Sequence, residues 1–131
     1  MKILLTAVLT LTLMGCGSTP QRYDNNEHEM LTRLAVGAEE LNILCAGDSV
    51  PAIKYAIQEL DAEAKVIALY SKYTPKNAEV HTVAKILAND LVELKIYYNT
   101  KLHNVVYCQA KTNLIYKKAD RILQVIPTKK R

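Results

Sequence analysis

Histidines, paired carboxylates and cysteines are the residues of this sequence that could carry chemistry. The three histidines stand alone, without a second metal ligand four residues away: His28, His81 and His103. Glu39 and Glu40 are adjacent, so on a helix they point about 100° apart and cannot face one substrate. Glu59 and Glu63 share a helical face that we expect to be solvated. Since phosphate loops and hydrolase motifs are missing as well, we expect no enzyme, no metal and no cofactor.

The first sixteen residues have the layout of an export signal. Lys2 supplies a positive charge, and residues 3–14 are apolar residues and threonines. This stretch is too short to span a membrane, which takes about 20 apolar residues, and it suits the apolar part of a signal peptide. It ends Leu13-Met14-Gly15-Cys16, which resembles the lipobox of bacterial lipoproteins. The resemblance implies that residues 1–15 are cleaved and that Cys16 carries lipid; an ordinary secretory signal with a chance cysteine is the alternative.

Lipidation would also set the location of the mature protein. A lipoprotein cysteine typically carries two or three acyl chains such as palmitate, and more than one chain holds a protein stably on a membrane. Gly17 follows Cys16, where an Asp would favour the inner membrane of a Gram-negative cell. The resemblance therefore implies the periplasmic face of the outer membrane, or the cell membrane in another kind of host.

After a polar tether at 16–24, the sequence predicts one helical domain at 25–126 and a basic tail at 127–131. Apolar residues recur every three or four positions at about 25–45, 50–73 and 78–126. Phe and Trp are absent, so Leu, Ile, Val, Ala and Tyr must fill narrow seams between helices. We predict an all-α fold, a small antiparallel three-helix bundle with coiled-coil-like seams, whose long C-terminal helix protrudes if it is continuous. A break near residues 98–100 would give four helices instead.

Cys45 and Cys108 remain once Cys16 is lipidated, and both fall on apolar seams. If the second and third helices fold back around Lys76, Cys45 comes level with residue 107. An even pair of cysteines in an oxidising compartment favours a disulfide, which would stabilise the fold by about 4 kcal/mol. Two buried thiols are the alternative. A metal or redox role is less favoured, because no CxxC motif or histidine cluster accompanies the pair.

Charge is distributed unevenly along the chain. Residues 16–93 hold seven basic and twelve acidic side chains, whereas residues 94–131 hold nine basic and one acidic. We predict that residues 111–131 form a basic amphipathic arm that binds a protein partner or an anionic envelope surface, with no role in nucleic-acid binding. The candidate contact residues are Lys111, Lys117, Lys118, Arg121, Lys129, Lys130 and Arg131. The alternative is that the apolar face of this arm packs back on the first helix.

These features favour a non-catalytic, outer-membrane-anchored lipoprotein that acts as a structural or protein-interaction module. Thr128 and the basic residues after it make the layout similar to that of Braun-type murein lipoproteins. The chain also resembles the outer-membrane spanin subunit of a tailed phage in being a small lipoprotein, which would imply host-cell lysis with an inner-membrane partner. A third hypothesis is an immunity or exclusion lipoprotein. These hypotheses rest on architecture, because the lipobox is the only specific motif.

Overall fold

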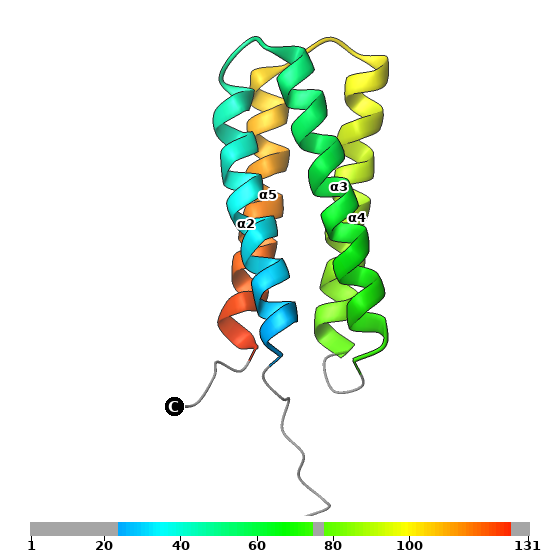
Figure 1. Cartoon of the computed structure of the whole chain (residues 1–131). Coiled ribbons are helices and arrows are strands. Elements are labelled where there is room, and N and C mark those ends of the chain that lie inside the picture. Colours follow the sequence, from blue (N-terminus) through cyan, green and yellow to red (C-terminus); the bar gives the residue numbers. More distant parts are fainter. Residues whose placement is uncertain (1–23, 75–77, 127–131) are drawn as a thin grey trace, which may run out of the picture.

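The structure is a computed structural model, and it describes residues 24–74 and 78–126. These residues form the helices α2 (Asn25–Cys45), α3 (Val50–Lys72), α4 (Ala78–Thr100) and α5 (Val105–Val125). The helices run alternately up and down, so that α2 begins and α5 ends at the lower end of the bundle in Figure 1. The predicted all-α helical bundle is confirmed. The three-helix version was wrong, and the alternative, a break near residues 98–100 that gives four helices, is confirmed in the described residues.

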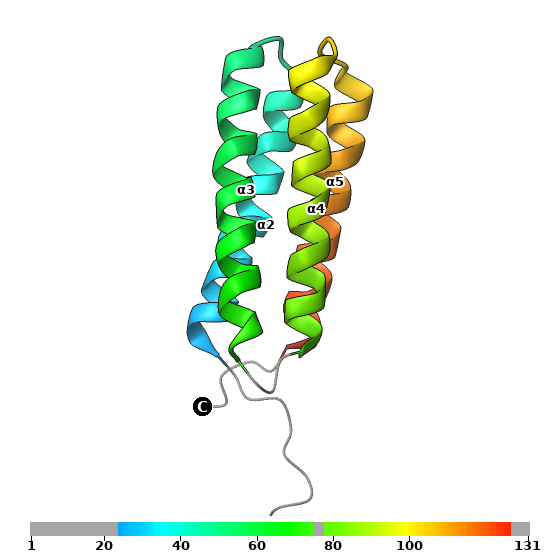
Figure 2. The ribbon, with the colours of Figure 1, turned by 90° about the vertical axis from the view of Figure 1, so that its right-hand side faces the viewer.

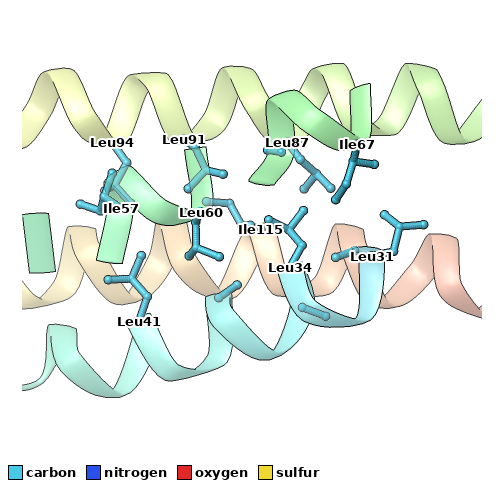
Figure 3. Packing of buried hydrophobic residues seen from close by; sticks show 14 of the residues in the cluster. Leu31, Leu34, Leu41, Ile57, Leu60, Ile67, Leu87, Leu91, Leu94 and Ile115 are labelled. Atoms are coloured by element: carbon cyan, nitrogen blue, oxygen red, sulfur yellow. The ribbon is translucent and has the colours of Figure 1, made fainter. Parts of the chain in front are cut away.

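The four helices surround one apolar core. Each helix packs against two neighbours, α2 against α3 and α5, and α4 against α3 and α5. Figures 1 and 2 show the same arrangement from two sides. Leucines and isoleucines from all four helices meet between them (Figure 3), and the labelled ones are Leu31, Leu34, Leu41, Ile57, Leu60, Ile67, Leu87, Leu91, Leu94 and Ile115. Because every helix buries one stripe, the domain needs no Phe or Trp to fill its interior.

The predicted continuous helix at 78–126 is broken by a short loop after Thr100. Asn104 has extended backbone angles, and its side-chain oxygen accepts a hydrogen bond from the Tyr107 backbone N–H at 3.0 Å. This is an N-cap, which satisfies one of the donors that a new helix leaves without a partner. The break allows α5 to turn back and cover α2.

The predicted C-terminal arm does not protrude from the bundle over its described part, residues 111–126. The α5 residues Thr112, Ile115, Ala119 and Ile122 are buried, and α5 packs along α2. The alternative prediction, that the apolar face of this segment packs back on the first helix, is confirmed. Residues 111–125 are thus part of the core rather than an appendage.

His103 fixes the loop between α4 and α5 to the loop between α2 and α3. Its Nε2 lies 2.8 Å from the Gly47 carbonyl oxygen, and its Nδ1 lies 2.7 Å from the Tyr98 hydroxyl oxygen. Because a carbonyl oxygen only accepts, Nε2 carries a proton, and in the neutral ring Nδ1 accepts from the tyrosine. The upper end of the bundle in Figure 1 is therefore tied across its two loops.

Among the helices at 24–74 and 78–126, none combines the length and the apolar character that crossing a membrane requires.

Candidate functional site

The seam between α4 and α5 is open over its lower half and bridged over its upper half. The open half is a groove of about 610 Å³. Its apolar lining comes from Val83, Ile86, Ile122 and Val125. Ile86 and Val125 remain 44% and 57% exposed, so the groove holds apolar surface that the chain itself leaves uncovered in the described residues.

Charged side chains stand along this groove. Lys118 and Arg121 of α5 contribute to its lining, and Glu79 of α4 is the acidic residue in it. Arg121 and its neighbour Lys117 are exposed on α5. The apolar floor is thus bordered by Arg121 and Lys118 on α5 and by Glu79 on α4, and Arg121 could pair with an acidic residue of a ligand whose apolar side fills the groove.

Two ion pairs close the seam above the groove. Lys118 Nζ lies 2.6 Å from Asp90 Oδ2, whose side chain is 10% exposed. One turn higher, Lys111 donates a hydrogen bond to Glu93. This hydrogen bond, with the attraction between the two charges, lowers the pKa of Glu93 and raises the pKa of Lys111. Higher still, the rings of Tyr97 and Tyr107 stack with their centroids 4.0 Å apart.

The structure separates the predicted basic residues into groups. Lys111 and Lys118 pair with acidic residues of α4, so their charges serve the bundle itself. Lys117 and Arg121 are exposed, and Arg121 lines the groove. The predicted tail residues Lys129, Lys130 and Arg131 lie outside the described residues, as does the predicted lipid site Cys16. Of the seven predicted contact residues, the described part of the chain therefore leaves two, Lys117 and Arg121, that are not paired with acidic residues of α4.

The predicted disulfide joins Cys45 and Cys108, with their Cα atoms 5.6 Å apart. Both residues are completely buried, where α2 ends and α5 begins. A polar cluster lies beside the bridge, in which Asn42 Nδ2 donates to Thr112 Oγ1 at 2.8 Å and to the Gln109 carbonyl at 2.9 Å. The predicted pairing is confirmed. The disulfide links the last residue of α2 to the first turn of α5, at the upper end of the bundle.

The histidines have structural contacts in this fold. His81 Nδ1 lies 2.9 Å from the Ala68 carbonyl oxygen, which links α4 to α3 near their connection. His103 ties the two upper loops together, as described above. In the part of the chain that the structure describes, no group of three potential ligands is close enough to hold a metal ion.

Sequence reasoning missed the groove because it expected a single helix at 78–126. Val83 and Ile86 lie beside the core stripe of α4 rather than on it, so a search for the buried stripe passes over them. Asn104 was the signal that could have revealed the turn, because Asn is a preferred N-cap residue. Once the chain turns there, Val83 and Ile86 must face the last turns of α5.

No protein-family model, curated protein or solved structure matches this chain.

Proposed function

We propose that this chain is a lipid-anchored, non-catalytic interaction module of the bacterial envelope, and that it binds a protein partner through the groove between α4 and α5. The observation that carries the proposal is the half-open seam. Its upper part is bridged by Lys111 and Lys118, while its lower part leaves Ile86 and Val125 exposed beside Arg121.

The bundle is well suited to present this groove from a membrane anchor. The start of α2 and the end of α5 lie at the same end of the bundle, the lower end in Figure 1. Because α2 follows the tether, an anchor at Cys16 would hold this end nearest the membrane. The eight tether residues 17–24 can reach at most about 28 Å when extended. The groove lies on the lower half of the bundle, because its residues come from the first turns of α4 and the last turns of α5. A partner bound there would stay close to the membrane surface.

The chemistry of the groove favours an amphipathic helix with an apolar stripe and an acidic residue that faces Arg121. Helices that dock in grooves insert apolar side chains at every third or fourth position. Ile86 and Val125 would gain burial, and Arg121 would pair with an acidic residue of the partner.

Two isoleucines of α4 provide a matched test of the groove. Ile86→Asp puts a charge in the groove, whereas Ile96→Asp changes an isoleucine that is 56% exposed elsewhere on the same helix. We expect partner recovery from cross-linked envelopes to fall strongly for Ile86→Asp and to stay unchanged for Ile96→Asp, with similar thermal melts. Equal recovery of the same partner by both variants would contradict the proposal.

A further inference from the structure

A second groove follows the seam between α2 and α3, on the side of the bundle away from the α4–α5 seam. It consists of two adjoining hollows of about 340 and 240 Å³, which share Arg33 and Glu63 in their linings. The upper hollow reaches Leu44 and the lower one reaches Met30. This stretch of α2 is about 21 Å long at 1.5 Å per residue, enough to lay about four turns of another helix alongside.

The floor of this groove is apolar because the two helices approach closely. A methyl group built on Gly37 would lie 2.5 Å from Leu60 Cδ2, so any larger residue there would force the Leu60 side chain to shift. On either side, Val36 is 49% exposed and Val66 is 56% exposed. The groove therefore offers exposed aliphatic surface from both helices, with α2 on one side and α3 on the other.

The rim of this groove is acidic. Glu40, Glu59 and Glu63 contribute to the lining, and no residue at 24–74 or 78–126 forms an ion pair with any of them within 4.0 Å. The one basic residue in the lining, Arg33, is bound to Glu29 with N and O atoms 2.7 Å apart. Burial raises the pKa of Glu63, and the positive charge of Arg33 opposes that rise, so the charged form of Glu63 is partly desolvated.

We infer that the α2–α3 groove binds a basic amphipathic helix of a partner protein. Its apolar side chains would cover Val36 and Val66, and its lysines or arginines would pair with Glu40, Glu59 and Glu63. The α2–α3 rim holds three glutamates, whereas the α4–α5 rim holds Glu79 beside Arg121 and Lys118, so a basic helix is better matched to the α2–α3 groove. This inference rests on residues that the proposed function does not use.

The probe for this test is a labelled 18-residue helical peptide with a leucine stripe flanked by lysines. Its control is a peptide of the same composition with the leucines distributed around the helix. Fluorescence anisotropy with the full chain in non-ionic micelles, corrected for micelles alone, gives the affinities. We expect the striped peptide to bind at least about tenfold more tightly, because only it can place leucines along one groove. Equal affinities would overturn the inference.

Matched variants then locate the binding site. Glu59→Gln together with Glu63→Gln should weaken binding by about threefold to tenfold at low salt, as expected for exposed ion pairs. The effect should vanish at 1 M salt, where the Debye length is about 3 Å. Glu39→Gln, an exposed acid outside the groove, should have no effect. Full binding by the double variant, or equal loss with Glu39→Gln, would overturn the inference.

An aliphatic pair adds a readout that does not depend on charge. Val36→Asn should weaken binding of the striped peptide, and Ile43→Asn should not, although Ile43 is 70% exposed on the same helix. Thermal melts of both variants establish that the bundle is intact. Self-association of the chain that Val36→Asn abolishes, with no loss of peptide binding, would assign the groove to a second copy and overturn the inference.

Discussion

Removing the disulfide between α2 and α5 gives the sharpest test of the fold. Cys45 and Cys108 are 63 positions apart, and the chain-entropy relation for a loop of that length gives about 4.3 kcal/mol of stabilisation. A domain of about 100 residues unfolds with an entropy near 0.2 kcal/mol per degree, so this loss corresponds to a melting temperature lower by about 20 °C. Replacing both residues with alanine avoids leaving a buried hydroxyl without a partner.

The measurement is a pair of denaturant titrations followed by circular dichroism, on the double alanine variant and on the oxidised parent. The reduced parent is the control, and it should lose nearly as much stability as the variant. The slope of the free energy of unfolding against denaturant should rise slightly in both, because the unfolded chain is then less compact. A loss below about 1 kcal/mol would refute the reasoning, since it would mean that the bridge constrains the unfolded chain far less than this loop length requires.

Three further changes test the packing of α5 and the pairs that hold it. Ile115→Ala should cost about 2–5 kcal/mol in chemical denaturation, because this side chain is fully buried; a loss below 1 kcal/mol would show that α5 is not core. Asn104→Ala should cost about 1 kcal/mol by removing the N-cap, whereas Asn99→Ala should cost little; equal losses would contradict the cap. The hydrogen bond from Lys111 lowers the pKa of Glu93, so Glu93 adds stability above its unfolded pKa, and that stability is lost as the pH falls through the folded value. Glu93→Gln should therefore flatten the acid side of the stability curve, and an unchanged curve would contradict the pairing.

Much of the bundle could be predicted from the spacing of apolar residues. The stripes of α2 and α3 include Leu31, Leu34, Ile53 and Ile57, and all four are buried. The spacing of apolar residues matches the buried positions because each helix faces the core on one side only. The pairing of Cys45 with Cys108 was also predicted, but the level argument ran a straight helix through Cys108, whereas the chain turns after Thr100 and Cys108 lies in the first turn of α5.

The same rules favoured a continuous helix over the turn at Lys101, and a break near residues 98–100 was only the alternative. Residues 101–104 contain neither Gly nor Pro, and the apolar period continues through them with Tyr98, Leu102 and Val105. In the structure Leu102 is 90% exposed, so that apparent periodicity is accidental. What decides the turn is a long-range gain, the burial of the α5 stripe against α2, which outweighs the local continuity of the helix. The Asn104 cap allows the turn but is too weak a signal to require it.

Anchoring at Cys16 is the claim on which the proposed envelope function most directly depends, and the intact mass of the mature protein tests it. The chain expressed in a lipoprotein-processing bacterium should begin at Cys16, carry two or three acyl chains and fractionate with membranes. The Cys16→Ser variant should keep residues 1–15 or leave the membrane fraction, while its bundle melts as the parent does. A mature N-terminus at another residue, or an unmodified Cys16 thiol, would contradict the account.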